Sequence, residues 1–128
     1  MKKLTHKPTE KELEILQVIW SEGPCTVRTV NDVLNKQGEV GYTTTLKLMQ
    51  IMFDKGLLSR EKDGKTHIYH AEVSEQKAQK QLVDKLLNTA FGGSAMKLVM
   101  QALGNSKSSK EELQEIKDYL DKLEGGIK

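Results

Sequence analysis

Three consecutive threonines, Thr43–Thr45, stand at the head of an apolar, methionine-rich stretch, "GYTTTLKLMQIMFDKGLL". Threonine hydroxyls donate and accept hydrogen bonds, and threonine methyls can contact the methyl group of thymine. Placed at 100° steps around a helix, Thr43, Lys47 and Gln50 form a narrow polar strip opposite the apolar side chains. Lysine suits guanine or a phosphate, and glutamine suits a bidentate contact with adenine. The pattern therefore indicates a helix face that reads DNA.

A simpler interpretation is that the threonines only cap this helix. Threonine is favourable at an N-cap and unfavourable inside a helix, and three in a row exceed the need of one cap. We therefore expect Thr43 and Thr44 to contact DNA. The helical wheel turns Thr45 inward, which leaves its role open. Tyr42 falls on the apolar stripe, and its ring can pack in the core or its hydroxyl can touch a phosphate.

Two further helices are predicted before this one. "PTEKELEILQVIW" begins at a capping box formed by Thr9 and Glu12 and carries apolar residues at helical spacing. "TVRTVNDVLNKQG" begins at Thr26, with Gly38 as its stop. Thr26 and Arg28, at the start of this second helix, are candidate phosphate contacts, with ordinary surface as an equal alternative.

A change of period follows the methionine-rich helix. Apolar and polar residues alternate in "LLSREKDGKTHIYHAEV", and Asp-Gly is a strong signal for a hairpin turn. Three helices followed by a β-hairpin is the order of a winged helix-turn-helix, whose recognition helix lies in the major groove. The hairpin would then be the wing. Its candidate contacts to the DNA backbone are Arg60, Lys62 and Lys65.

The chain after Ser74 predicts helices with apolar stripes, broken at "GGS" and restarted at a capping box of Ser108 and Glu111. Apolar residues of the last helix recur at spacings of 3 and 4, which is a heptad pattern, and Ile127 continues it. This seam favours a dimer over packing within a monomer. The predicted dimerisation residues are Leu82, Leu86, Leu113, Ile116, Leu120 and Leu123.

The predicted fold class is mostly α (α+β). A winged-helix DNA-binding domain is expected over residues 1–72, and a helical dimerisation domain over residues 73–128. The helix-turn-helix order predicts double-stranded DNA as one partner, and the heptad seam predicts a second copy of the chain as another.

Composition narrows the remaining classes of function. The 128 residues are 37% hydrophobic and 30% charged, with a net charge of +2 that includes basic Lys2, Lys3 and Lys7 near the start. No apolar run is long enough to insert into a membrane, and no signal peptide is evident, so a cytoplasmic protein is expected. The single cysteine, Cys25, excludes an internal disulfide and a multi-cysteine metal site. We predict no enzyme activity, no metal and no cofactor.

The segments "PTEKELEILQVIW", "YTTTLKLMQIMFDKGLL" and "REKDGKTHIYHAEVS" resemble the penicillinase-repressor (BlaI/MecI/CopY) family of bacterial repressors. The resemblance covers almost the whole chain, and "YTT" before an apolar helix ending in "KGLL" is its most specific part. It implies an N-terminal winged helix, a C-terminal helical dimerisation domain, and dimers that bind inverted-repeat operators.

Two departures from the family pattern concern function. Ile51 stands where family members commonly carry arginine in the recognition helix. In the β-lactam branch of the family, a membrane sensor protease leads to cleavage at an Asn-Phe bond, and the matching bond here is Gln101–Ala102. The resemblance implies a repressor relieved by proteolysis, whereas the residue types of the matching bond depart from the Asn-Phe pattern. The alternative is a winged-helix protein-interaction module without specific DNA binding, which Ile51 and the weak net charge favour.

Overall fold

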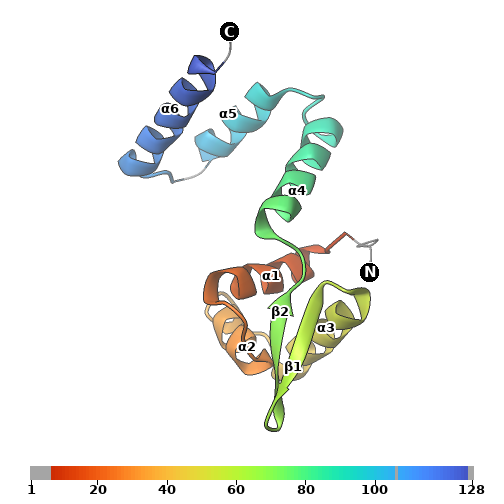
Figure 1. The fold of residues 1–128 in the computed structure, drawn as a ribbon. Helices are drawn as coiled ribbons and strands as arrows, with labels where there is room; N and C mark the ends of the chain where they lie inside the picture. Colours follow the sequence, from red (N-terminus) through yellow and green to blue (C-terminus); the bar gives the residue numbers. More distant parts are fainter. Residues whose placement is uncertain (1–6, 106, 127–128) are drawn as a thin grey trace. The chain divides into compact units, whose positions relative to one another are not determined.

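The computed structural model describes residues 7–105 and 107–126, and Figure 1 labels the helices and strands that they form. Lys2, Lys3 and Ile127 lie outside the described residues. In chain order the elements are α1 (Glu10–Glu22), α2 (Val27–Asn35), α3 (Tyr42–Lys55), β1 (Leu58–Asp63), β2 (Thr66–Ala71), α4 (Glu75–Thr89), α5 (Ala95–Asn105) and α6 (Lys110–Gly125). The predicted mostly helical fold with a β-hairpin is confirmed.

The chain divides into two compact units, one up to Gln81 and one from Leu82 on. The division falls within α4, because Ala78 in the first turns of that helix is buried with the core of the N-terminal unit. Trp20 on α1 holds the residues just before α4 against the N-terminal unit, because its Nε1–H donates to the carbonyl of Val73 at 2.9 Å. The functional boundary expected between residues 72 and 73 stays a prediction.

Local signals explain most of the boundaries of the N-terminal helices. The exception is the end of α2, which stops at Asn35 with Lys36 as its C-cap, before the predicted stop at Gly38. α1 starts at the predicted capping box, in which Glu12 N donates to Thr9 Oγ1 at 3.2 Å and Thr9 N donates to Glu12 Oε1 at 2.9 Å. Thr26 caps α2 in the same way, accepting from Thr29 N at 3.2 Å. α3 ends at Gly56, whose φ of 85° lies in the left-handed region that favours glycine.

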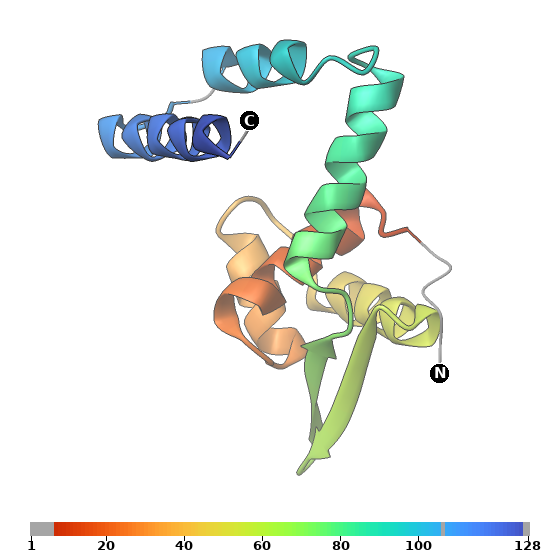
Figure 2. The same cartoon turned by 45° about the horizontal axis from the view of Figure 1, so that its top comes forward.

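The wing is an antiparallel hairpin that projects from the three helices (Figure 2). Asp63 pairs with Thr66, so the turn consists of Gly64 and Lys65, and Gly64 takes a φ of 65°. Backbone bonds between Cys25 and Tyr69 add the segment between α1 and α2 to the edge of β2, with Tyr69 N donating to the Cys25 carbonyl at 2.8 Å. The hairpin is thereby attached to the helices through its backbone.

Two polar contacts inside the N-terminal unit fix α3. Asn31 on α2 donates from Nδ2 to Thr45 Oγ1 at 2.8 Å and to the Val40 carbonyl at 3.0 Å. At the other end of α3, Lys55 Nζ lies 2.7 Å from Glu12 Oε2 on α1. Asn31, Thr45 and Glu12 are all buried, and Lys55 is partly exposed, so these bonds hold the helix at both ends through at least one buried partner each.

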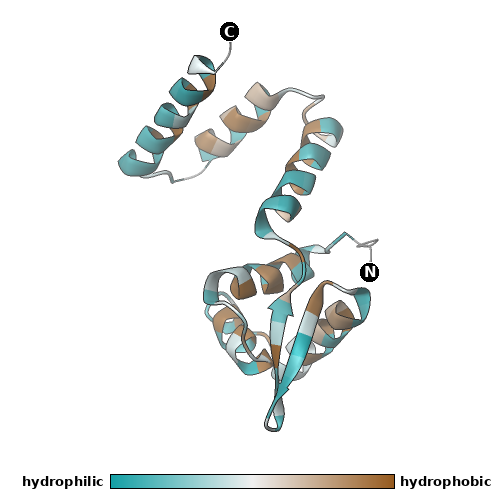
Figure 3. Ribbon diagram, viewed as in Figure 1, coloured by the Kyte–Doolittle hydropathy of each residue, from teal (hydrophilic) through white to brown (hydrophobic). Residues whose placement is uncertain are grey.

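The C-terminal unit buries far less of itself. From Leu82 to Gly126, leaving out residue 106, no described residue is buried, and Figure 3 shows apolar brown along α5. Its last helix starts one residue later than predicted: Ser109, not Ser108, is the N-cap, accepting from Glu112 N at 3.0 Å. The sequence "SSKEE" contains two overlapping Ser-x-x-Glu pairs, and the pattern alone does not choose between them.

Candidate DNA-binding surface

The run of threonines divides its roles along the first turn of α3. Thr43 and Thr44 are exposed, as are Lys47 and Gln50 further along the helix, so the predicted polar strip exists as a surface. Thr45 is fully buried and accepts the Asn31 hydrogen bond described above. Two threonines are therefore available to a partner, and the third holds α3 against α2.

A hollow of about 350 Å³ opens beside this strip, between the starts of α2 and α3 and the tip of the wing. It brings together four predicted contacts from three elements, namely Thr26, Arg28, Tyr42 and Lys65. Thr66, His67 and Tyr69 complete its wing side. Its lining contains one arginine, one lysine and no carboxylate, and this composition suits an anionic group such as a phosphate.

Tyr42 and Arg28 form a pair at the edge of this hollow. The Cζ atom of Arg28 lies 5.4 Å from the centroid of the Tyr42 ring, which is within the range of a cation–π contact. Tyr42 is 43% exposed, so its ring is neither core nor fully solvated. The contact restricts an exposed arginine side chain at the mouth of the hollow and lowers the entropy that it loses on binding.

Arg60 lies differently from the other predicted wing contacts. Its Cζ atom sits 4.0 Å from the centroid of the Phe53 ring on α3, and its Nη1 donates to Tyr69 Oη at 3.4 Å. The half-buried guanidinium thus links β1 to α3 within the chain. Sequence reasoning missed this contact, although the alternation that places Leu58 and Arg60 on one face of the strand was a usable signal. Whether Arg60 also touches DNA stays a prediction.

Lys62 is exposed on β1, outside the residues that line the hollow. The two wing histidines lie on opposite faces of the hairpin, since His70 Nε2 is 3.0 Å from Glu61 Oε1 while the ring of His67 lies edge-on to Tyr69 at 6.4 Å. Among the described residues no cluster of histidine, cysteine and carboxylate side chains could hold a metal. Each wing histidine is therefore an isolated polar group, and the described residues of the wing form no set of metal ligands.

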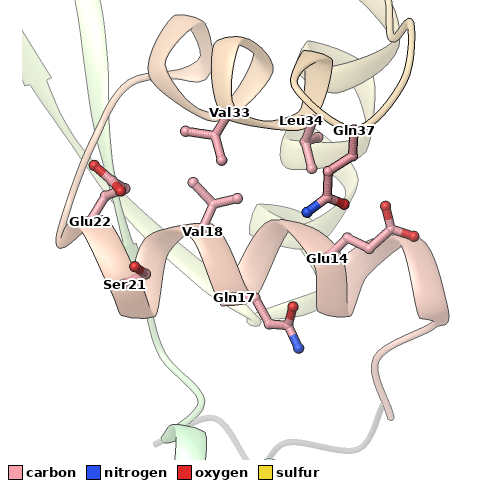
Figure 4. Close-up of a pocket in the computed structure, with 8 residues that line it drawn as sticks. All are labelled: Glu14, Gln17, Val18, Ser21, Glu22, Val33, Leu34 and Gln37. Carbon is pink, nitrogen blue, oxygen red and sulfur yellow. The ribbon is translucent and has the colours of Figure 1, made fainter. Parts of the chain in front are cut away.

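A second hollow, of about 160 Å³ between α1 and α2, has the opposite character (Figure 4). Val18, Val33 and Leu34 point toward one another there, and Glu14 and Glu22 stand at its ends. The lining contains two carboxylates and no cation. A phosphate would be repelled, so this face does not extend the candidate surface.

Two buried titratable groups have shifted pKa values. Burial alone would raise the pKa of the Glu12 carboxyl, but the hydrogen bonds and charge of Lys55 and the bonds from Thr9 outweigh it and lower the pKa below its ordinary value. Burial raises the pKa of the Cys25 thiol, and the charge of Glu22 raises it further. The thiol therefore stays protonated and is a poor nucleophile.

The predicted dimerisation residues occupy α4 and α6. Their exposed fractions are 40% for Leu82, 47% for Leu86, 40% for Leu113, 56% for Leu120 and 47% for Leu123, and Ile116 is half-buried. Gln101 and Ala102 lie within α5, and both are exposed. No helix in the described part of the chain is long and apolar enough to cross a membrane.

Comparison with known proteins identifies the family of this chain. The sequence model of the penicillinase repressor family matches residues 8–122. The chain is 22% identical to the methicillin resistance regulatory protein MecI of Staphylococcus aureus over 118 residues, which are 92% of this chain and 96% of that protein. It is 25% identical to the penicillinase repressor of Bacillus licheniformis over 113 residues, 88% of each.

Solved structures agree with the fold. The solution structure of the DNA-binding domain of the repressor BlaI matches with a TM-score of 0.52 and 26% identity, over 60% of this chain and 93% of that one. Monomeric Bacillus licheniformis BlaI in complex with the blaP half-operator matches over the same shares with a TM-score of 0.50 and 26% identity. The transcriptional regulator Tm0710 of Thermotoga maritima shares the fold alone, with a TM-score of 0.53 and 21% identity over 93% of this chain and 75% of that one.

Proposed function

Because the chain belongs to the penicillinase repressor family, we propose that it represses transcription as a homodimer that binds inverted-repeat operators in double-stranded DNA. That it is a DNA-binding repressor follows from the family and from its likeness to the DNA-binding domain of BlaI. The observation that carries the finer proposal is the junction of the exposed α3 strip with a cationic hollow beside the wing.

The side chains divide into two groups by what they would contact. Thr43, Thr44, Lys47 and Gln50 lie along the recognition helix and would read base edges in the major groove. A second group would hold phosphates and set the register of the protein on the duplex. Its members are Thr26, Arg28, Tyr42, Arg60, Lys62 and Lys65.

Dimerisation is supported by the exposed apolar side chains of α4 and α6, which a second copy would cover. Two linked recognition helices about 34–36 Å apart would match half-sites one helical turn apart. Binding of the first half-site then raises the effective concentration of the second recognition helix at its own half-site. The operator should accordingly be palindromic.

Release from DNA is proposed to follow proteolysis in the C-terminal unit, in a cytoplasmic protein that responds to a membrane sensor protease. The exposure of Gln101 and Ala102 supports access to that bond. Their position within α5 means that the helix must open locally before a protease can cut it. An intact chain after induction of the cognate sensor would contradict this part of the proposal.

The test of operator binding is a fluorescence-anisotropy titration of the full chain against the DNA upstream of its own gene, at two salt concentrations, with a random duplex as control. The repressor predicts tight binding that prefers its own upstream DNA and weakens steeply with salt, because phosphate contacts release counterions. Equal, weak and salt-insensitive binding to both duplexes would contradict the proposal and favour an interaction module.

A further inference from the structure

A third hollow lies between α1 and α3 and is separate from the cationic one. It has a volume of about 410 Å³, and its apolar lining residues are Ile15, Leu34, Val40, Leu48 and Ile51. Its charged lining residues are all exposed, and we refer to them as its rim. Sites for small molecules commonly have volumes of roughly 300–1,000 Å³ and apolar walls with a few polar groups. The side chain of Ile51 is 37% exposed. An apolar residue is therefore open to water on a helix that is proposed to bind DNA, a polyanion.

The rim of this hollow is positively charged. Lys11 on α1 and Lys47 on α3 contribute two ammonium groups, and Glu14 contributes one carboxylate. Within the part of the chain that the structure describes, neither Lys11 nor Lys47 forms an ion pair with a carboxylate. An apolar floor below a rim of net positive charge is complementary to a molecule with an apolar body and an anionic head.

We propose that this hollow binds a small amphipathic anion, of the class of medium-chain carboxylates. The acyl chain packs on Ile15, Leu48 and Ile51, and the carboxylate stays at the rim that carries Lys11 and Lys47. Burial of the methylenes of the chain against these apolar walls favours binding, and the entropy of association opposes it.

Occupancy is coupled to DNA, and this step rests on the proposed function. Thr44 and Lys47 line the hollow and also belong to the strip proposed to read bases. An anion at the rim neutralises Lys47 and adds negative charge where DNA would approach. The two ligands therefore oppose each other, and by linkage each lowers the affinity of the protein for the other by the same factor.

The binding test uses isothermal titration calorimetry of the full chain without DNA. Decanoate is the probe, and nonyltrimethylammonium is the matched ligand with the same nonyl chain and the opposite charge. We expect one decanoate per chain, bound at least tenfold more tightly than the cation. Equal affinities, tighter binding of the cation or no saturable binding of decanoate would overturn the proposal.

Variants locate the site. Ile51→Glu places a carboxylate on the floor and should weaken decanoate at least tenfold, while Gln17→Glu adds the same charge in the hollow between α1 and α2 and should leave it unchanged. Lys11→Gln removes one rim cation that is not a proposed DNA contact and should weaken decanoate severalfold. Circular dichroism confirms that each variant is folded. Unchanged binding in folded Ile51→Glu would overturn the assignment to this hollow.

A competition experiment separates this inference from the proposed function. Saturating decanoate should lower operator affinity at least tenfold in the parent chain and have no effect in Ile51→Glu. If the chain binds decanoate but no DNA, the repressor proposal fails and the anion site stands. If it binds both independently, the coupling is wrong.

Discussion

The two units of the chain differ in how far they bury their apolar residues. In the N-terminal unit, Ile15, Leu16, Val30, Met49 and Met52 are buried to within a few per cent of their surface, and all described buried side-chain polar atoms have hydrogen-bond partners. In the C-terminal unit, large apolar side chains of all three helices stay exposed, up to 72% for Met96. The first unit closes its own core, whereas the second leaves an apolar surface exposed.

The largest effect that tests this difference between the two units is expected from a substitution in α6. Leu120→Asp places a charge on the exposed apolar seam and should dissociate the dimer. Loss of bivalent binding should lower operator affinity by about 10²–10⁴-fold. Sedimentation equilibrium measures the mass, and anisotropy measures the affinity. Lys117→Asp on the same helix is the control, and a Leu120→Asp dimer with full affinity would show that the unit needs no partner.

The self-sufficiency of the N-terminal unit is tested at its buried ion pair. Lys55→Met leaves the carboxylate of Glu12 buried without its cation, which should lower the free energy of unfolding by about 2 kcal/mol. Urea unfolding followed by circular dichroism measures this loss. Lys77→Met, at an exposed lysine, should stay within about 0.5 kcal/mol of the parent.

The pair of Lys55 and Glu12 also makes the stability of the N-terminal unit depend on pH, in a direction that follows from the pKa of Glu12. The pKa of Glu12 is lowered in the folded state, so its pairing stabilises the fold above the ordinary pKa of 4.5 and is lost as pH falls through the lower folded value. The parent chain should therefore lose stability on acidification below about pH 4.5, and Lys55→Met should lose less. Parallel pH profiles of the two proteins would contradict the role given to the pair.

Within the N-terminal unit, substitutions of proposed base-contacting and backbone-contacting residues should change DNA affinity in different ways. Lys47→Ala should lower operator affinity about tenfold and leave affinity for random DNA nearly unchanged, because a good base contact contributes about 1–3 kcal/mol of discrimination. Competition titrations with both duplexes measure the ratio. Equal losses on the two duplexes would refute the assignment of Lys47 to base reading.

The smallest effect is expected on the wing. Lys62→Ala should weaken operator and random DNA by the same factor of a few, and it should reduce the slope of log affinity against log salt by about 1. Anisotropy at four salt concentrations measures both quantities. Lys117→Ala serves as the control, and a selective loss of operator binding in Lys62→Ala would move Lys62 into the base-reading group.

Features that depend on neighbours in sequence could be predicted. The capping box at Thr9, the cap at Thr26 and the end of α3 at Gly56 all follow from residue types within four positions. The Asp63–Gly64 signal places the hairpin turn to within one residue of the observed turn, Gly64 and Lys65. The predicted strip on α3 is exposed for the same reason, since helical periodicity alone separates its faces. Where two local signals competed, as at Ser108 and Ser109, the sequence was not decisive.

Features that depend on packing could not be predicted. Asn31 donates to Thr45 fourteen residues away, and Lys55 reaches Glu12 across forty-three. Arg60 is read from sequence as a free wing cation, and only the approach of β1 to α3 places it over Phe53. The hollow beside the wing likewise needs three elements to meet, so its residue types were predicted but not its shape.

The hydrogen bond from Trp20 to Val73 has a spectroscopic consequence. Trp20 is the single tryptophan of the chain, and its half-buried indole lies wholly within the N-terminal unit. Selectively excited emission therefore follows the unfolding of that unit alone, whereas far-ultraviolet ellipticity counts the helices of both. Coincident denaturation curves from the two signals would mean that the units melt as one cooperative body, and separated curves would resolve each unit's stability without a label.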